Sequence, residues 1–170
     1  IENVLEKSGK NKNDIELLCT GTTQGDLPIP GFASMVHAES GLTNCEIANF
    51  QSVCASSMMA LKNTYTQIKS GEHQTALCLG SEFASRQFKA SRYEAQGLKR
   101  LSFDTEFLRW MLSDGAGAFV LQDKPNTNGL SLKIEWIDLE SHAHKFPVCM
   151  YTGKTNNKDE HEKSSRGSLQ

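Results

Sequence analysis

The sequence predicts an α/β fold built around a mostly parallel sheet. Three segments have the length and composition of buried strands, at residues 15–22, 45–50 and 75–82, and the last of them is continuously apolar. Helix-like segments, with apolar residues at three- and four-residue spacing, separate them. Strands that alternate with helices are typical of sheets whose faces are covered by helices. With 170 residues, the chain is long enough for one domain with a real core.

The first part of the chain alternates helices and strands. Residues 1–8 have helical spacing, and Gly9 follows as a stop signal before the first strand. Prolines and glycines predict a loop at residues 24–31. The segment FASMVHAESGL then predicts a second helix that ends at Gly41, ahead of the second strand.

A longer helix is predicted over residues 55–70, and Gly71 ends it. Its apolar stripe consists of Met58, Leu61, Tyr65 and Ile68. Other positions around the helix, such as Ala60 and Thr64, are also uncharged. We therefore expect most of the circumference to be buried, as in the middle of a layered fold.

The second part of the chain is less regular. Residues 83–109 mix charges with aromatic side chains and predict a long excursion with some helix. LSDGAGAFVLQ predicts a glycine-rich turn that runs into a strand, and the alternating residues 130–141 predict a further strand. We expect residues 1–150 to form the folded part and the polar residues 151–170 to be a mobile tail.

Composition excludes several classes of function. A net charge of −2 argues against a nucleic-acid-binding protein, and no apolar run approaches the roughly 20 residues of a membrane span. The chain starts with a polar stretch and without Met, so we expect no signal peptide and infer a fragment. Five cysteines without a CxxC pair favour a reducing cytoplasm over a disulfide scaffold.

One cysteine lies where a strand turns into the long helix. Cys54 precedes the helix start, where the helix dipole and the free N–H groups favour a thiolate. The thiolate is the nucleophilic form, and the same N–H groups could stabilise a thioester oxyanion. The alternative is an inert structural cysteine, and local chemistry alone leaves both open.

The order of several motifs resembles the N-terminal half of a type III ketosynthase, the 3-oxoacyl-acyl-carrier-protein synthase III branch of the thiolase superfamily. The matching motifs are GTT at 21–23, a helix reaching Gly41 and Leu42, Cys54 before a small-residue helix start, IKSG at 68–71, ALCLGSE at 76–82, and SDGAGA at 113–118. The match covers about residues 1–138. It implies a thiolase-like fold, layered α-β-α-β-α when complete, with this chain as the N-terminal half without its opening strand.

The resemblance implies that Cys54 is the nucleophile of an acyltransferase. Cys54 would accept an acyl group from an acyl thioester, and the intact enzyme would then perform a decarboxylative Claisen condensation with malonyl-acyl-carrier protein. The family's catalytic His and Asn belong to the C-terminal half, so we expect this fragment alone not to complete the condensation. No cofactor is implied, with acyl-CoA and malonyl-acyl-carrier protein as substrates. The expected partners are acyl-carrier protein, the missing C-terminal half and a second copy in a homodimer.

Four more residues receive supporting roles. Ile29 corresponds by spacing to the family segment that reaches the partner subunit's acyl pocket, or else it packs within its own subunit. Asp114 is expected to accept hydrogen bonds from turn amides, either for the site or simply as a turn former. Gly115 and Gly117 are expected to allow a tight turn and a close approach of the backbone to the long helix.

Other polar residues are read as structural or surface residues. The pair His142 and His144 lacks a third ligand nearby, so no metal site is predicted. Four cations could face an acidic carrier protein or a phosphopantetheine phosphate, or could form a solvated face: Arg92, Lys99, Arg100 and Arg109.

The sequence also departs from the family pattern. Ala55-Ser56-Ser57 replaces the usual small-Gly-Phe, Ser113 stands where Gly is common, and the excursion over 86–110 is long. Fatty-acid initiation and a secondary-metabolite ketosynthase both stay open.

Two rival functions stay open as well: a non-catalytic partner subunit or acyl-binding module, and a thiolase or hydroxymethylglutaryl-CoA-synthase-like enzyme. The DGAGA segment favours the ketosynthase. A lone half would expose a large apolar face, so we expect a missing partner segment or a dimer to cover it.

Overall fold

The computed structural model describes residues 1–95, 97, 103–127, 129–146, 151–152 and 168–169. The chain divides into two compact units, which are considered separately. The first unit comprises Ile1–Glu82 and Gly115–Leu139, and the second comprises Phe83–Asp114 and Glu140–Gln170.

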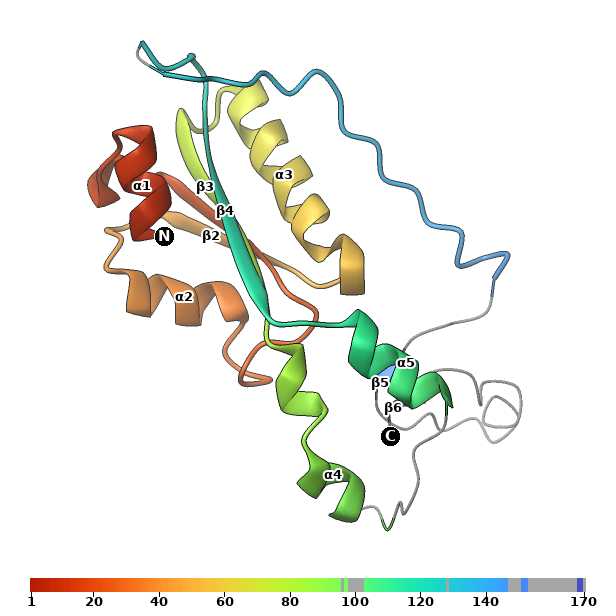
Figure 1. The fold of residues 1–170 in the computed structure, drawn as a ribbon. Helices are drawn as coiled ribbons and strands as arrows, with labels where there is room; N and C mark the ends of the chain where they lie inside the picture. The colour runs from red at the N-terminus through yellow and green to blue at the C-terminus, as the bar shows by residue number, and fades with distance from the viewer. Residues whose placement is uncertain (96, 98–102, 128, 147–150, 153–167, 170) are drawn as a thin grey trace. The chain divides into compact units, whose positions relative to one another are not determined.

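A four-stranded sheet with the order β2-β1-β3-β4 forms the first unit (Figure 1). Its strands are β1 (Leu17–Gly21), β2 (Glu46–Phe50), β3 (Thr75–Glu82) and β4 (Gly115–Gln122). Strand β1 pairs in parallel with both β2 and β3, whereas β4 runs antiparallel to β3. This arrangement confirms the predicted α/β fold with a mostly parallel mixed sheet.

Helices cover both faces of this sheet (Figure 1). They are α1 (Glu2–Ser8), η1 (Lys12–Asp14), α2 (Phe32–Ser40), η2 (Val53–Ala55) and α3 (Ser56–Ser70). Helix α3 ends at Gly71, whose φ of 78° is a left-handed value that suits glycine. The predicted long helix and its stop are therefore confirmed to within one residue.

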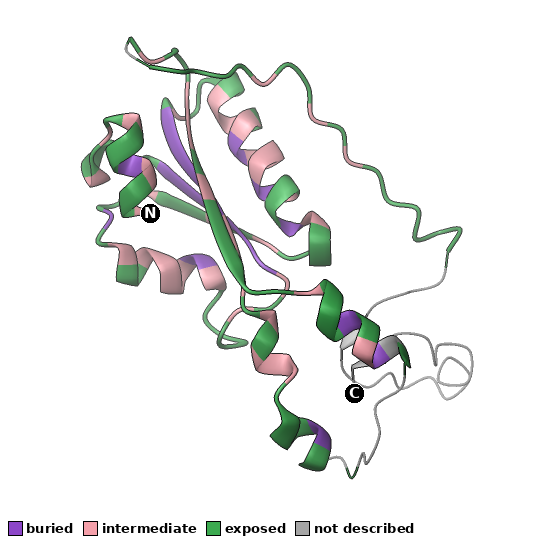
Figure 2. Cartoon of the chain, in the orientation of Figure 1, coloured by how far each residue is buried: buried purple, intermediate pink, exposed green. Residues whose placement is uncertain are grey.

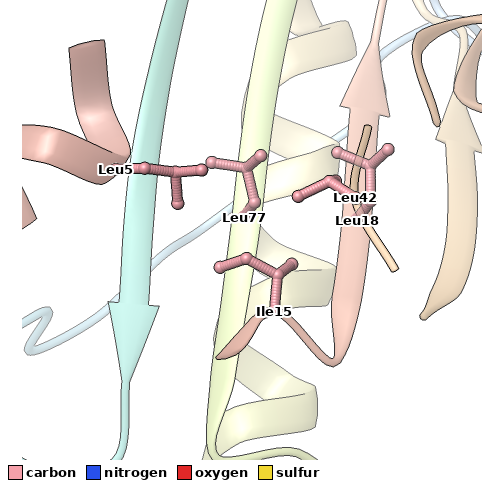
Figure 3. Close-up of a cluster of buried hydrophobic side chains, with 5 residues drawn as sticks. All are labelled: Leu5, Ile15, Leu18, Leu42 and Leu77. Carbon is pink, nitrogen blue, oxygen red and sulfur yellow. The ribbon is translucent and has the colours of Figure 1, made fainter. Parts of the chain in front are cut away.

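Two buried clusters lie on opposite faces of the sheet, because neighbouring residues of a strand point to opposite sides. One cluster consists of Leu5, Ile15, Leu18, Leu42 and Leu77 (Figure 3). The other consists of Leu17, Cys19, Ala60, Ala76 and Cys78, and it packs against α3. Strand β1 is buried along its whole length (Figure 2). This explains its continuous apolar run.

Helix α3 buries a narrower face than its sequence predicts. Its buried residues are Ser56, Ala60 and Thr64, spaced four apart, while Met58 is 43% exposed. Figure 2 shows buried, intermediate and exposed segments alternating along α3. Small side chains face the sheet because the helix lies very close to it at its first turn. The larger apolar residues of the predicted stripe lie beside this face, where Leu61 and Ile68 pack against the cluster from its flank.

The second unit contains the predicted excursion with some helix. Its elements are η3 (Ala84–Gln87), α4 (Ala90–Ala95), α5 (Phe103–Met111) and two short parallel strands, β5 (Tyr151–Thr152) and β6 (Ser168–Leu169). Lys99, Arg100 and most of the predicted tail at 151–170 lie outside the described residues. The boundary at residue 150 therefore stays a prediction.

The predicted strand at 130–141 is wrong. Residues 130–140 adopt neither helix nor strand, and Leu130, Leu132 and Trp136 are 83%, 84% and 78% exposed. A strand needs a neighbour to accept and donate its backbone hydrogen bonds. No strand of the described residues pairs with this segment. Among the described residues, no helix is long and apolar enough to span a membrane.

Candidate active site

Cys54 lies where the chain turns from β2 into α3. Val53–Ala55 form the short helix η2, and α3 begins at Ser56. Val53 has a φ of 45°, a left-handed value that is rare for a β-branched residue. Such backbone strain persists only where the surrounding structure holds it in place. We call residues 52–56 the Cys54 turn.

Ser56 closes the Cys54 turn on itself. Its Oγ accepts a hydrogen bond from the Ser52 amide at 2.8 Å and donates one to the Val53 carbonyl at 2.7 Å. Ser56 is only 2% exposed, whereas Cys54 between these anchors is exposed. One departure from the family pattern thus has a structural role, because the Ser56 hydroxyl fixes the turn that presents the thiol.

A cavity of about 280 Å³ borders the thiol. Its lining includes Cys54, Met58, Leu61, Cys78, Glu82 and Phe119. The lining is mainly apolar, with few polar groups, which is typical of sites that bind the hydrocarbon part of a small molecule. The cavity lies at the carboxyl ends of the parallel strands, the edge at which α/β sheets commonly bind ligands.

The close approach of the sheet to α3 occurs at glycines other than those predicted. A Cβ atom on Gly21 would lie 2.5 Å from the Ser56 carbonyl carbon, and one on Gly80 would lie 2.7 Å from the Ser57 Cβ. Both distances are shorter than real Cβ contacts, so both positions require glycine.

Gly115 and Gly117 do not have the predicted geometry. They lie inside β4 opposite Glu82 and Gly80, and an added Cβ on either would meet nothing within 4 Å. The predicted tight turn and close approach to the long helix are therefore wrong at these two residues. Both instead line the cavity beside Cys54.

Glu82, the last residue of β3, contacts the loop of residues 21–23, which we call the GTT loop. Its Oε1 accepts hydrogen bonds from both the amide and the hydroxyl of Thr23, each at 2.6 Å. The sequence contained the signal for this pair, since GTT and ALCLGSE both carry the family resemblance. No role follows from either motif until the fold brings them together.

Asp114 accepts hydrogen bonds from one residue of the second unit. The Ser85 hydroxyl donates to its Oδ2 at 2.6 Å, and the Ser85 amide donates to its Oδ1 at 2.8 Å. The bond from the hydroxyl has the larger effect and the bond from the amide the smaller one, and together they hold the pKa of the Asp114 carboxyl below its ordinary value. Asp114 therefore binds a backbone amide as expected, and its support of the Cys54 site stays a prediction.

Ile29 is 85% exposed in the loop before α2. It therefore does not pack within the described part of its own chain, and its role across a dimer stays a prediction. Arg92 donates to Gln87 at 2.6 Å, and Arg109 forms an ion pair with Glu106 at 3.2 Å. These two cations thus have partners within the second unit, and a carrier-binding role for them also stays a prediction.

The other described thiols are covered. Cys19 and Cys78 are buried and Cys45 is half-buried, so among the described residues only Cys54 offers an exposed thiol. Burial raises the pKa of the Cys78 thiol to about 11, although a hydrogen bond with Thr64 acts in the opposite direction. Burial likewise raises the pKa of Cys45.

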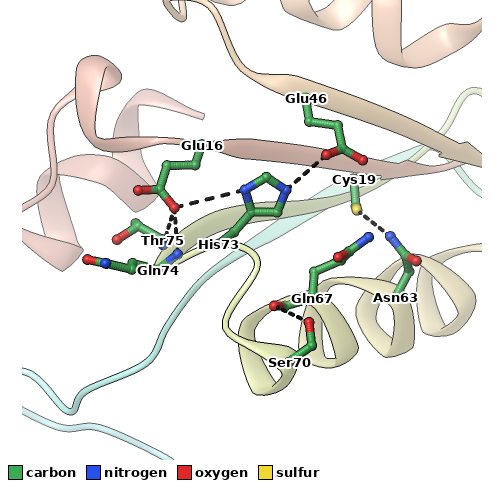
Figure 4. Close-up of polar contacts among 9 residues, drawn as sticks. All are labelled: Glu16, Cys19, Glu46, Asn63, Gln67, Ser70, His73, Gln74 and Thr75. Carbon is green, nitrogen blue, oxygen red and sulfur yellow. Dashed lines mark hydrogen bonds and ion pairs between the residues drawn. The ribbon is translucent and has the colours of Figure 1, made fainter.

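No described histidine lines the Cys54 cavity. His73 Nε2 lies 3.0 Å from a Glu46 carboxylate oxygen, and its Nδ1 lies 4.0 Å from Glu16 (Figure 4). This histidine joins the starts of neighbouring strands. His37 lies 3.0 Å from the Thr43 carbonyl oxygen. Within the described ranges, no group of three His, Cys, Asp or Glu is placed to hold a metal ion.

Comparison with known proteins shows the family to which the chain belongs. The sequence profile of the 3-oxoacyl-[acyl-carrier-protein] synthase III family matches residues 48–138, so the chain belongs to this family of enzymes. Beta-ketoacyl-[acyl-carrier-protein] synthase III of Cereibacter sphaeroides is 33% identical over 69% of this chain and 32% of its own length. The synthase III of Neisseria gonorrhoeae is 34% identical over 74% of this chain and 36% of its own.

Solved structures show the same fold. AbyA1, a tetronic acid condensing enzyme, matches with a TM-score of 0.60 and 27% identity over 74% of this chain and 36% of its own. The synthase III of Aquifex aeolicus matches with a TM-score of 0.61 and 19% identity over the same shares. The predicted thiolase-like fold is thus confirmed. The chain spans about a third of the length of the curated relatives it matches.

Proposed function

We propose that Cys54 is the acyl-accepting nucleophile of a type III ketosynthase. The observation that carries this is the exposed thiol at the start of α3, beside an apolar cavity, in a chain of this family. The Cys54 thiolate attacks the carbonyl carbon of an acyl thioester, and the donor thiolate leaves and takes up a proton. The product is an acyl group joined to the Cys54 sulfur.

The second step belongs to the intact enzyme. Malonyl-acyl-carrier protein loses CO₂, and the resulting carbanion attacks the carbonyl carbon of the acyl-Cys54 thioester. The Cys54 thiolate then leaves, and the product is a β-ketoacyl-acyl-carrier protein. The proposal places the His and Asn that assist this step outside the present chain. Acyl transfer to Cys54 is therefore the part that this chain can be tested for.

The proposed partners follow from the same assignment. The relatives are named as acyl-carrier-protein synthases, which supports a carrier protein as one partner of this chain. A homodimer would give the exposed Ile29 a surface to contact. The reaction requires no cofactor, and we place it in the cytoplasm.

The proposal is tested by the mass of the full chain after incubation with acyl-CoA donors of short, medium and long chain. The expected result is one acyl adduct, located by peptide mapping on Cys54. Cys54→Ala should abolish the adduct, whereas the matched control Cys45→Ala should keep it. A chain that binds acyl-CoA without forming an adduct on any cysteine would instead be an acyl-binding module, and the proposal would fail.

A further inference from the structure

Among the described residues, Glu82 is the one acidic side chain that lines the Cys54 cavity. Its Oε1 accepts two hydrogen bonds of 2.6 Å, both from Thr23. Hydrogen bonds to an ionised carboxylate are about twice as strong as those between neutral groups. This half-buried carboxylate therefore fixes the GTT loop to the end of β3.

The GTT loop is also bonded to the strand that leads to Cys54. The Gln51 side chain donates to the Thr23 carbonyl, and the Thr22 amide donates to the Phe50 carbonyl at 3.1 Å. Thr22 is 3% exposed, so this part of the loop has little freedom to move. The GTT loop thus joins the ends of β2 and β3.

The GTT loop in turn sets the position of the Cys54 turn. Gly21 lies so close to the backbone of Ser56 and Ser57 that no side chain fits between them. Ser56 holds the Cys54 turn through its bonds to Ser52 and Val53. A shift of Gly21 toward α3 must therefore move the start of α3 or the turn in front of it, because the two backbones are already in close contact.

From this chain of contacts we propose that Glu82 is a positioning residue for Cys54. It acts through Thr23 and Gly21 on the backbone amides at the start of α3, and it takes no part in bond making. Those amides stabilise the oxyanion that forms when the thiol attacks a thioester, so small displacements lower the rate of acyl transfer. The inference rests on the proposed function for this last step only.

The test compares Glu82→Gln and Thr23→Val with the unmodified full chain. Glu82→Gln removes the charge of the acceptor, and Thr23→Val removes the hydroxyl donor at nearly constant size. The rate of acyl-adduct formation on Cys54 should fall at least about tenfold in each variant, the scale of a lost charge-assisted bond. The double variant should be acylated no more slowly than the slower of the two single variants. Thr23→Ser keeps the hydroxyl donor, so it should be acylated at the rate of the unmodified chain.

Alkylation and hydrogen exchange separate positioning from loss of the fold. Iodoacetamide reacts with the Cys54 thiolate and forms no oxyanion, so its rate at Cys54 should fall much less than the rate of acyl transfer in all variants. Amide hydrogen exchange should become faster at residues 21–23 and 52–57. The matched control is Glu16→Gln, because the Glu16 carboxylate also accepts from backbone amides, those of Gln74 and Thr75. It should speed exchange only near residues 73–75 and leave acylation unchanged.

Two outcomes distinguish this inference from the proposed function. If the unmodified chain is acylated and Glu82→Gln changes neither acylation nor exchange at 52–57, the inference is overturned and the function stands. If the unmodified chain is never acylated but Glu82→Gln speeds exchange at 52–57, the function fails and the positioning stands.

Discussion

Cys54 and Cys78 border the same cavity but differ in exposure and in environment. Cys54 belongs to an irregular turn at the edge of the sheet, so its thiol reaches solvent. Cys78 lies within β3 and faces α3, so the residue is 2% exposed and burial raises the pKa of its thiol to about 11. At the scale of single residues, place in the fold thus decides which sulfur can react.

This difference predicts selective alkylation. At pH 8, a thiol with a pKa near 11 is about 0.1% ionised, and only the thiolate reacts. Iodoacetamide should therefore label Cys54 at least about tenfold faster than Cys78 in the folded chain. Peptide mass spectrometry over time measures both rates, and the unfolded chain in urea should label both cysteines alike. Equal rates in the folded chain would contradict the described burial.

Cys78 also predicts a loss of stability in alkaline solution. Its folded pKa is about 11 and its ordinary value is 9.0, so the unfolded chain releases this proton first as the pH rises. The contribution of the protonated Cys78 thiol to the free energy of unfolding is complete below pH 9 and is lost between pH 9 and pH 11. The free energy of unfolding should be about 1 kcal/mol lower by pH 10 for this reason. Urea unfolding under a reducing agent should show a flatter decline from pH 8 to pH 10 in Cys78→Ala than in Cys54→Ala. Identical slopes would disprove this.

At the scale of elements, the close contact between α3 and the sheet depends on two glycines, which have no side chain. Gly21 on β1 and Gly80 on β3 lie under the first turn of α3, where Ser56 and Ser57 follow the Cys54 turn. The same closeness explains why the buried face of α3 consists of small residues. The start of the helix, and with it the thiol, is therefore positioned by backbone packing.

Alanine substitutions measure this packing. Gly80→Ala should lower the free energy of unfolding by about 1–3 kcal/mol, because its new Cβ meets the Ser57 side chain. Gly21→Ala should cost more, since its Cβ meets backbone atoms that cannot rotate away. The control, Gly117→Ala in β4, should change stability by less than about 0.5 kcal/mol. Urea unfolding measures the stability of the three variants. A Gly117→Ala variant as unstable as Gly80→Ala would show that the close contact with α3 is not the cause of the loss.

At the scale of the whole molecule, the described residues include large apolar side chains that are exposed. Leu130, Leu132 and Trp136 lie in a segment that forms no strand, and Phe119 on β4 is 62% exposed. Exposed apolar patches of this kind mark interaction surfaces or sites of aggregation. This agrees with the expectation that a half of this fold needs a cover.

The exposed segment predicts concentration-dependent self-association. Light scattering behind a sizing column should show a mass that rises with concentration, because association removes Leu132 and Trp136 from water. Leu132→Lys should weaken this association. Ser131→Lys adds the same charge beside the apolar side chains and should weaken it less. A chain that stays monomeric at all concentrations, or variants that behave alike, would show that this segment does not drive association.

The sequence by itself determined the strands of the four-stranded sheet, the helices that cover it and the candidate nucleophile. The apolar runs of β1 and β3 are local patterns that reflect burial, whereas β2, which was expected to be a buried strand, forms as predicted but is largely exposed. The start of α3 and the place of Cys54 follow from helix signals within a few residues. These features are short-range, so no knowledge of the partner elements was needed.

Only the tertiary structure decided which residues act together. Gly21 and Gly80 meet α3 while Gly115 and Gly117 do not, although all four stand in glycine motifs. Thr23 and Glu82 are 59 residues apart and meet because β1 and β3 are neighbours in the sheet. The alternation at 130–141 predicted a strand for which the described part of the chain offers no strand to pair with. In each case the outcome depends on a contact between segments that are distant in the sequence. A local sequence pattern carries no information about such contacts.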